Sequence, residues 1–586
     1  AGAAAAAAQP GPPPSEEDLA AARAVFAANL AAIAAKDRDA YLATYLHAPT
    51  LARTGFEGPL VGFEDFAAQA GEWPDVFEGR DLELVPVADG VIYGTYRYRV
   101  AYAGDEHRGI SERVFVETPG GWRIAVTSAF DAPPGTPPPP LALVGGTLLD
   151  GTGAPPVADA VVVLRGGLVD CAGTRAACPV PEGIETVDVA GRWITPGLVD
   201  AHVHFSQTGW ADGRPDALDA RDRFPYAETI AENAARPERF FRSYLCSGVT
   251  AVFDVGGYPW TLDLSERAER DTLAPRVAAA GPLLSTWDFW LNLPGERQFV
   301  YLADEAAGRD GVAWLAARGA DAVKVWLIVT GERPLDEMER AVAAAGAEAE
   351  RRGLPLVVHA TGLAEAKAAL GAGADVLVHG VDDQPVDEEF LDLARAAGTV
   401  YTPTLTVPGG YLALYRSAAG GEPPAVDDPN GCVDPETRAK VAATPELDPP
   451  PGLDLDRVAA RLAAQRRVAD ENLLRVHRAG IPVALGTDAG NPLTLHGPAV
   501  YAELEAMQAA GLSPMEVLVA ATRNAARAMG RPDLGTLAPG QAADLLVLAA
   551  DPTAGAAAFR SVTHVARGGV LRPVAELGPL AAGGSP

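Results

Sequence analysis

The chain has few lysines and few basic residues overall. Its 586 residues include four lysines, and lysine and arginine together number 47 against 77 aspartates and glutamates, for a formal net charge of −30. A nucleic acid needs a basic surface to bind its phosphates, so this composition argues against a nucleic-acid partner. The sequence also lacks an uninterrupted apolar run of about 18 residues, so it predicts no membrane span.

Cysteine is equally scarce, with four residues: Cys171, Cys178, Cys246 and Cys432. An even number suits an oxidising compartment, and the absence of a second close pair argues against a zinc knuckle. Cys171 and Cys178 flank a short loop, which leaves a local disulfide and two free thiols both open.

The first 14 residues are rich in alanine, glycine and proline and show no pattern that could form a core, so we expect a flexible tail. A removed secretory signal would explain a start at Ala1, although the remnant of an expression tag would look the same. We therefore expect a secreted or periplasmic protein.

Six polar residues stand out because of their position: each ends or interrupts an apolar run of about strand length. They are His202, His204, Lys324, His359, His379 and Asp488. Burying a lone charge there is costly unless the charge is paired or binds a metal. Side chains i and i+2 of a strand share a face, so the two histidines of His-Val-His can hold one ion together. The pattern predicts a single metal cluster.

This order, His-x-His, Lys, His, His and Asp on successive strands, resembles the two-metal branch of the amidohydrolase superfamily. The segments 195–204, 378–380 and 537–548 resemble its imidazolonepropionase-like and prolidase-like members. The resemblance covers roughly residues 141 to 575. Where those relatives often have His-Ala-His-Gly this chain has His359-Ala-Thr-Gly, and where Glu-His-Gly is common it has Val378-His-Gly. These departures concern the substrate rather than the metals.

The predicted fold class is α/β. Strand-like runs alternate eight times with helical patterns across residues 194–530, which indicates a (β/α)8 TIM barrel. We place its strands near 196–204, 250–255, 276–280, 322–327, 355–359, 375–379, 400–405 and 482–488. The six polar residues then fall at the C-terminal strand ends, where barrel enzymes carry their chemistry. The resemblance implies a small β-sandwich formed by 141–193 and 531–575.

A separate α+β domain is predicted for residues 15–133. A capping-box start at Ser15 begins a helix to about Ala35, helices follow at 39–46 and 63–70, and alternating strands cover 82–130. This segment resembles the polyketide-cyclase-like, or nuclear-transport-factor-like, cone fold. Such domains often dimerise or hold a small ligand, so we expect a homo-oligomer. A proline-rich linker at 134–140 and a flexible tail at 576–586 complete the predicted organisation.

The resemblance also assigns roles within the cluster. His202, His204 and Asp488 would hold one divalent ion, and His359 and His379 the other, with zinc expected because imidazole suits it. An ammonium group has no lone pair and cannot bind metal. In the family such a lysine is carbamylated and bridges both ions, which implies this role for Lys324. A metal-bridging hydroxide would attack the substrate, and Asp488 would be the catalytic proton carrier.

Candidate substrate contacts follow the second, third and fourth strands and the eighth. They are Tyr258, Trp260, Trp287, Trp290, Trp326 and, after the last strand, His496. The aromatic residues could form a pocket for an apolar side chain, and packing in the core explains them equally well. For His496 the interpretation as an ordinary structural histidine also stays open.

The predicted function is a metal-dependent hydrolase that cleaves the amide bond of a small, peptide-like substrate, either a dipeptide or an N-acyl amino acid. A lactonase or other esterase, or a hydrolase of another cyclic amide, could use the same hydroxide. A non-enzymatic alternative is a binding protein whose N-terminal domain holds the ligand, and the intact ligand set argues against it.

Overall fold

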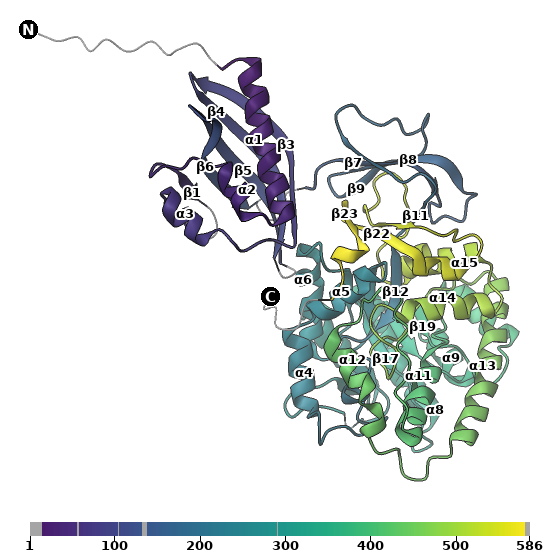
Figure 1. The fold of residues 1–586 in the computed structure, drawn as a ribbon. Coiled ribbons are helices and arrows are strands. Elements are labelled where there is room, and N and C mark those ends of the chain that lie inside the picture. The colour runs from purple at the N-terminus through teal and green to yellow at the C-terminus, as the bar shows by residue number, and fades with distance from the viewer. Residues whose placement is uncertain (1–13, 55–57, 103–104, 132–136, 290, 580–586) are drawn as a thin grey trace, which may run out of the picture. The chain divides into compact units, whose positions relative to one another are not determined.

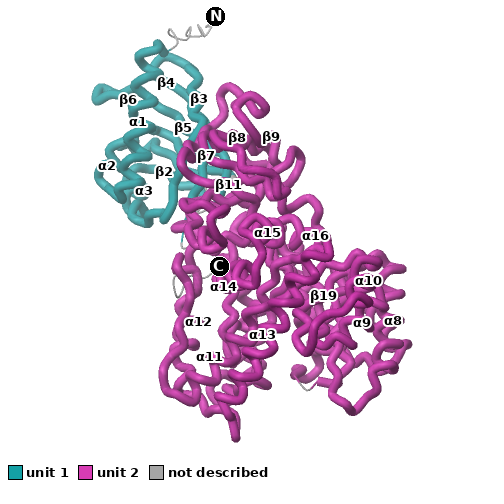
Figure 2. The backbone as a smooth tube through the Cα atoms, turned by 90° about the vertical axis from the view of Figure 1, so that its right-hand side faces the viewer, with its two compact units in different colours: residues 1–136, 580–586 teal, residues 137–579 magenta. Residues whose placement is uncertain are grey.

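The computed structural model describes residues 14–54, 58–102, 105–131, 137–289 and 291–579. Most of the first predicted tail, part of the predicted linker, most of the last predicted tail and the candidate Trp290 lie outside these residues. The chain forms two compact units, residues 1–136 with 580–586 and residues 137–579, shown in different colours in Figure 2.

Unit 1 is an α+β structure, as the sequence predicts. Its helices are α1 (Glu16–Ala35), α2 (Arg38–Ala43) and α3 (Phe63–Gln69). Its strands are β1 (Ala52–Thr54), β2 (Leu60–Val61), β3 (Val76–Ala88), β4 (Val91–Tyr102), β5 (Asp105–Thr118) and β6 (Gly121–Asp131), in the order β2-β1-β6-β5-β4-β3. Helix α1 lies across one face of this sheet (Figure 1). The more specific resemblance to a cone fold stays a prediction.

The predicted capping box begins α1. The Ser15 side chain accepts from the Asp18 backbone N–H, and the Asp18 side chain accepts from the Ser15 backbone. Helix α1 is also long and apolar enough to cross a membrane, judged by its length and composition only. It nevertheless has three acidic residues in its first turn and buries Phe26 and Ile33 within unit 1, as the core helix of a folded domain does.

The β-sheet that flanks the barrel in unit 2 is assembled from both ends of this unit. Its strands are β7 (Leu141–Leu148), β8 (Val157–Arg165), β9 (Leu168–Thr174), β10 (Glu185–Asp188), β11 (Trp193–Pro196), β21 (Leu545–Leu548), β22 (Val562–Arg567) and β23 (Val570–Pro573). The order is β23-β22-β21-β11-β7-β8-β9, with β10 paired to β7. The early and late segments therefore belong to one hydrogen-bonded sheet, joined where β11 pairs antiparallel with β21.

Parallel strands form the barrel. They are β12 (Leu198–Val203), β13 (Val249–Asp254), β14 (Arg276–Ala279), β15 (Leu283–Ser285), β16 (Phe299–Tyr301), β17 (Val323–Trp326), β18 (Leu356–His359), β19 (Val376–Val378) and β20 (Val400–Thr402). The hydrogen-bonded orders are β12-β13-β14 and β16-β15-β17-β18-β19-β20. Backbone bridges from Tyr401 to Val483 and from Val203 to Ala489 connect the two edges through residues 483–489.

Helices surround these strands (Figure 1). They are α4 (Tyr226–Ala235), α5 (Glu238–Cys246), α6 (Leu264–Arg270), α7 (Glu305–Ala316), α8 (Leu335–Arg352), α9 (Leu363–Gly371), α10 (Glu388–Ala397), α11 (Val407–Gly420), α12 (Pro435–Ala442), α13 (Leu455–Arg478), α14 (Ala499–Ala509), α15 (Pro514–Val519) and α16 (Ala525–Ala528). The predicted barrel fold is confirmed.

Two predicted strands differ from the observed ones. The third barrel position is split, because β14 ends at Ala279 and β15 begins at Leu283 after a turn through Gly281 and a proline. The eighth, expected at 482–488, makes isolated bridges instead of a regular strand. Pro482 cannot donate to a ladder, and Asp488 has a left-handed backbone with φ of 58°, so regular pairing fails at both ends.

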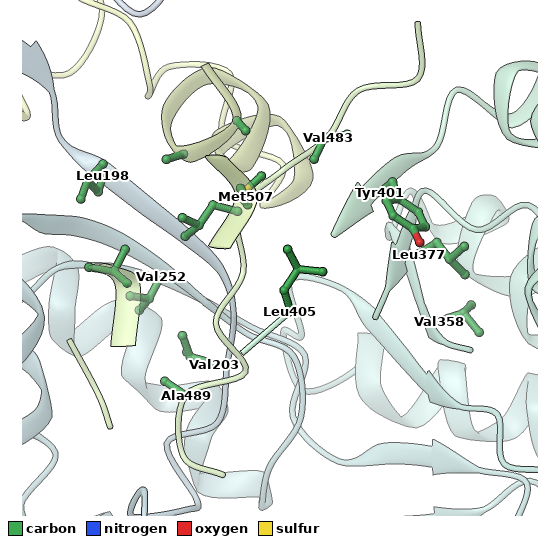
Figure 3. Packing of buried hydrophobic residues seen from close by; sticks show 14 of the residues in the cluster. Leu198, Val203, Val252, Val358, Leu377, Tyr401, Leu405, Val483, Ala489 and Met507 are labelled. Atoms are coloured by element: carbon green, nitrogen blue, oxygen red, sulfur yellow. The ribbon is translucent and has the colours of Figure 1, made fainter. Parts of the chain in front are cut away.

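The barrel core is apolar and closely packed. Figure 3 shows Leu198 and Val203 of β12, Val252 of β13, Leu377 of β19 and Met507 of α14 within one buried cluster. Burial of a Leu, Val or Met side chain contributes roughly 1.5–3 kcal/mol. The strands are thereby held rigidly enough to fix the polar side chains at their ends.

Disulfides join all four cysteines. Cys171 pairs with Cys178 across the short loop, which resolves the alternative left open by the sequence. Cys246 at the end of α5 pairs with Cys432, in the segment between α11 and α12. The second bond ties a long segment of the chain back to the barrel.

Candidate metal centre and active site

His202 and His204 project from the end of β12 toward one point. Their Nε2 atoms lie 3.2 Å apart. The Nδ1 of His204 lies 2.7 Å from the Gly256 carbonyl oxygen, which can only accept, so Nδ1 is the donor and Nε2 keeps its lone pair. The i, i+2 spacing therefore does place two imidazoles side by side.

Asp488 reaches the same point from the other edge of the barrel. Its Oδ1 lies 3.3 Å from the His202 Nε2 and 3.0 Å from the His204 Nε2. A Cβ on Gly486 would lie 2.5 Å from the Thr402 side chain and 2.8 Å from the His202 Cβ, so only glycine permits this close approach. The left-handed backbone at Asp488 is the kind of local strain that is found at functional sites.

His359 and His379 lie next to this group. Their ring centroids are 4.3 Å apart, and the His202 and His379 rings are 4.9 Å apart. The His379 Nδ1 lies 2.8 Å from the Thr404 hydroxyl, and both residues have a left-handed backbone. Ligand atoms of His202, His379 and Asp488 all lie within 4.8 Å of one another, so His379 also lies close to the first predicted set of ligands.

Lys324, on β17, completes the cluster. It is 1% exposed, and among the described residues its Nζ has no hydrogen-bond partner. Burial lowers the pKa of Lys324 to about 7, with Asp488 opposing the shift. The amine is therefore neutral in a substantial fraction of molecules near pH 7.

Three histidines of the cluster, His202, His359 and His379, are neutral at the same pH. Burial, followed by the charge of Lys324, holds the pKa of His202 and of His359 well below the usual range, and burial has the same effect on His379. Neutral imidazoles whose lone pairs converge on a carboxylate are the donor set that binds a divalent cation such as zinc. The residues present therefore fit a metal centre.

Two buried aspartates that the sequence reasoning missed hold the cluster in place. Asp200 accepts from the Thr487 hydroxyl and from the backbone N–H groups of Thr487 and His202, which ties β12 to the Asp488 segment. Asp254 accepts from the backbone of Phe205 and Gly256. Burial raises the pKa of Asp200 to about 7 and that of Asp254 to about 6. Both aspartates lie within apolar strands, and this pattern in the sequence could have identified them as candidate site residues.

A cavity of about 780 Å³ opens over the cluster. One wall is apolar, formed by Leu283, Phe289, Leu291, Phe299 and Trp326, and another is formed by helices α11 and α13. Three arginines, which sequence reasoning also missed, line it: Arg214, Arg416 and Arg466. Arg214 pairs with Asp216 at 2.7 Å and Arg466 with Asp470 at 2.6 Å. For Arg416 the described residues supply no ion-pair partner.

Of the aromatic candidates for substrate contact that the structure describes, one belongs to the cavity lining and three do not. Trp326 lines the cavity, and its contact with substrate stays a prediction. Tyr258 is buried outside the cavity wall and donates to the Tyr226 hydroxyl, while Trp287 is 37% exposed with its ring 6.0 Å from that of Trp326. Trp260 is only partly buried and packs against the barrel core.

His496 does not reach the cavity, contrary to the candidate role given to it. Its Nδ1 lies 2.8 Å from the Tyr244 hydroxyl and its Nε2 lies 2.8 Å from the Gln207 carbonyl. Its ring stacks with Phe205, at 5.7 Å between centroids. Burial lowers the pKa of His496 to about 3. It is a structural histidine with both nitrogens engaged, and nothing local in the sequence distinguishes it from a ligand.

A parallel barrel with a buried His/Asp/Lys cluster at its C-terminal strand ends defines a metal-dependent barrel hydrolase. The model of the Amidohydrolase family matches residues 193–572. An imidazolonepropionase from Caulobacter vibrioides (strain NA1000 / CB15N) is 31% identical over 427 residues, which cover 67% of this chain and 88% of that protein. The chain belongs to the amidohydrolase family and is a metal-dependent hydrolase of carbon–nitrogen bonds in amides.

Solved structures share the fold. A crystal structure of a Xaa-Pro dipeptidase with bound methionine has a TM-score of 0.55 at 22% identity and covers 74% of this chain and all of that one. The structure of molinate hydrolase has a TM-score of 0.55 at 23% identity and covers 75% of this chain and 96% of that one. At the level of the fold, these similarities agree with the predicted resemblance to prolidase-like members.

Proposed function

We propose that this protein is a two-metal hydrolase that cleaves the amide bond of a small substrate bearing a carboxylate, either a dipeptide or an N-acyl amino acid. The observation that carries the proposal is the convergence of His202, His204 and Asp488 within 3.3 Å, at the floor of a cavity large enough for such a molecule.

In this proposal His202, His204 and Asp488 hold one ion, His359 and His379 hold the other, and zinc is the expected metal. Such ions, when bound, lower the pKa of a coordinated water and polarise the substrate carbonyl. The protein residues supply the remaining parts of the reaction. The Asp488 carboxylate takes up the proton of the attacking water and delivers it to the leaving amine nitrogen, so an acid and an amine are released.

Lys324 is proposed to bridge the two ions as a carbamate. Its neutral amine nitrogen forms a bond to the carbon of carbon dioxide and releases one proton, and the resulting carboxylate offers two oxygen ligands. The burial of Lys324 and its lowered pKa favour the neutral amine that this reaction needs. An unmodified ammonium would add a further positive charge next to the two divalent ions.

The shape and charge of the cavity support the substrate class. The apolar wall with Phe289, Phe299 and Trp326 suits a large apolar side chain next to the scissile amide. Arg416, which lines the cavity from α11, is an exposed guanidinium that can pair with a substrate carboxylate bidentately. A free acid should therefore bind better than the corresponding neutral amide.

The test is a panel assay on the purified zinc-loaded protein. It compares aromatic dipeptides and N-acyl amino acids with their C-terminal carboxamides, and includes lactones and the cyclic amide imidazolonepropionate, because an imidazolonepropionase is among the relatives. We expect amine release from the free acids. Hydrolysis of lactones or cyclic amides, with none of the dipeptides or N-acyl amino acids, would contradict the proposed substrate class.

A matched pair of variants tests the role of Arg416. Arg416→Gln should raise KM for the free acid at least about tenfold, the effect of losing a charge-assisted hydrogen bond, while kcat stays within about threefold. The control is Arg467→Gln, because Arg467 is exposed on α13 away from the cavity wall. Equal KM values in the two variants would show that another group binds the carboxylate.

The location and assembly of the protein are also proposals. Two disulfides that use all four cysteines support an oxidising compartment, and we propose a secreted or periplasmic enzyme. Fractionation of the native host, followed by detection with an antibody, tests this. The expected homo-oligomer is tested by light scattering on the full chain.

A further inference from the structure

Unit 1 contains a buried arginine that forms no ion pair with any of the described residues. Arg113, on β5, is 6% exposed, and its guanidinium remains protonated at any physiological pH. Its NH1 donates to the Ser111 hydroxyl at 2.6 Å and to the Glu112 carbonyl oxygen at 3.0 Å, and its NH2 donates to the Tyr96 hydroxyl at 2.7 Å. Its Nε has no partner among the described residues.

No carboxylate of the described residues pairs with Arg113. The adjacent acid, Glu112, points to the opposite face of the sheet, because successive strand residues alternate. There Glu112 accepts from the Tyr93 hydroxyl at 2.7 Å and from the Ser128 hydroxyl at 3.1 Å. Burial raises the pKa of Tyr96 and of Tyr41, so these phenols are neutral at pH 7 and offer dipoles rather than charge. A buried cation with neutral partners alone is unfavourable.

The surroundings of Arg113 combine aromatic rings with polar atoms. The Arg113 guanidinium lies over the Tyr96 ring at 5.0 Å, and the Tyr45 hydroxyl donates to that of Tyr41 at 3.0 Å. The Tyr41 ring contacts that of Trp73 at 5.6 Å between centroids. Tyr41 and Trp73 are half-buried, so the aromatic cluster reaches the surface of the unit. A mostly apolar lining with a few convergent polar groups is typical of small-ligand sites.

We propose that unit 1 binds a small monocarboxylic acid with an aromatic or branched apolar body, and that the carboxylate pairs with Arg113 while the body contacts Tyr41, Tyr45 and Trp73. A carboxylate supplies the one negative charge that the single guanidinium lacks and can accept from Nε and from the tyrosine hydroxyls. A phosphate dianion would require a second cation. This site shares no residue with the metal centre, and the proposal stands whether or not the proposed substrate class is correct.

The experiment measures binding of 4-fluorobenzoate to the full chain by ¹⁹F NMR titration. The wild-type protein should bind this probe, and Arg113→Gln should weaken binding at least about tenfold, the expected loss for a charge-assisted hydrogen bond. Arg97→Gln is the matched control, because Arg97 is exposed on the neighbouring strand β4 and should bind as the wild type does. The neutral isostere 4-fluorobenzamide should bind at least about tenfold more weakly than the acid.

Two further variants serve as controls, one for the location of binding and one for correct folding. Arg416→Gln removes the guanidinium proposed to bind the substrate carboxylate in the barrel cavity and should leave probe binding unchanged, which distinguishes this site from the catalytic one. Tyr45→Phe keeps the ring and removes one hydroxyl, so it should fold and bind about threefold to tenfold more weakly. Binding that survives Arg113→Gln, absence of binding to the wild-type protein at millimolar probe, or binding of inorganic phosphate in preference to the acid would each overturn the proposal.

Discussion

His204 Nε2 lies 3.0 Å from Asp488 Oδ1, although the two residues come from the first and the last strand positions of the barrel. The contact is possible because Gly486 lets its segment approach β12 and because Asp200 ties the two segments together through Thr487. Asp488 is therefore placed both to bind metal and to exchange a proton with the attacking water and the leaving amine.

Replacement of Asp488 by asparagine should separate these two roles. Asp488→Asn keeps the shape and one oxygen ligand but cannot accept a proton, so turnover should fall by roughly 10² to 10⁴ while metal content falls only modestly. Turnover and metal content are measured on the same preparation, with a substrate whose amine is a poor leaving group. The control is Asp392→Asn, which changes an exposed acid paired with Arg395 on α10. Near-native turnover in Asp488→Asn would assign the proton to another group.

Lys324→Ala should remove the proposed bridge. We expect two zinc equivalents per chain in the wild-type protein, fewer in the variant, and loss of most activity. Short-chain carboxylic acids such as acetate should partly restore activity by supplying the missing carboxylate. Elemental analysis and rate measurements with and without acetate check this, with Lys367→Ala as the control because Lys367 pairs with Asp387 on the exterior. Full activity at one zinc equivalent would rule out the bridged pair.

Glu503 should make stability depend on pH. It is fully buried and accepts from the backbone N–H groups of Leu405 and Thr406, and burial raises its pKa to about 7. Between about pH 4.5 and 7 the folded protein keeps this proton while the unfolded chain loses it. The contribution of Glu503 to the free energy of unfolding is thus complete below about pH 4.5. It is lost as pH rises toward 7, and the loss amounts to at most about 3 kcal/mol.

Urea unfolding at several pH values measures the slope of the free energy of unfolding against pH. Glu503→Gln should flatten it, because the glutamine does not titrate. Glu505→Gln, on the same helix and paired with Arg560, should keep the wild-type slope. An unchanged slope in Glu503→Gln would mean that the carboxyl group is already ionised in the folded protein.

Removal of the two disulfides should destabilise the protein unequally. Cys246 and Cys432 are separated by 186 residues and Cys171 and Cys178 by 7. If the bonds act through the entropy of the unfolded chain, their loss costs about 5 kcal/mol and about 2.5 kcal/mol, respectively. Denaturant unfolding of Cys246→Ser/Cys432→Ser is compared with Cys171→Ser/Cys178→Ser. A larger effect from the short loop would contradict the entropic explanation.

Local patterns predicted much of the architecture. The helical spacing after Ser15, the alternation of strands with helices and the i, i+2 pair His202 and His204 each depend on neighbours within a few residues. The ends of parallel strands meet at one edge of a barrel, so the order of His359, His379 and Asp488 along the chain was enough to predict that they gather.

Other features depend on contacts between distant segments. Three such features have no local signature: the pairing of Cys246 with Cys432, the lack of an ion-pair partner for Arg416 among the described residues, and the enclosure of His496 by Tyr244 and Gln207. The irregular eighth strand follows from the left-handed backbone at Asp488, which the regular apolar pattern of its segment conceals.

The sequence by itself determined which residue types the site can use and the order in which the barrel presents them, because strand and helix periodicity is set within each segment. Only the tertiary structure decided which polar groups are paired. Arg214 and Arg416 look alike in the sequence, and so do Arg97 and Arg113. Yet Arg214 and Arg97 each pair with an aspartate, and within the described part of the chain Arg416 and Arg113 do not. The physical reason is that burial and ion pairing depend on the positions of side chains from distant segments, which are set by packing of the whole fold.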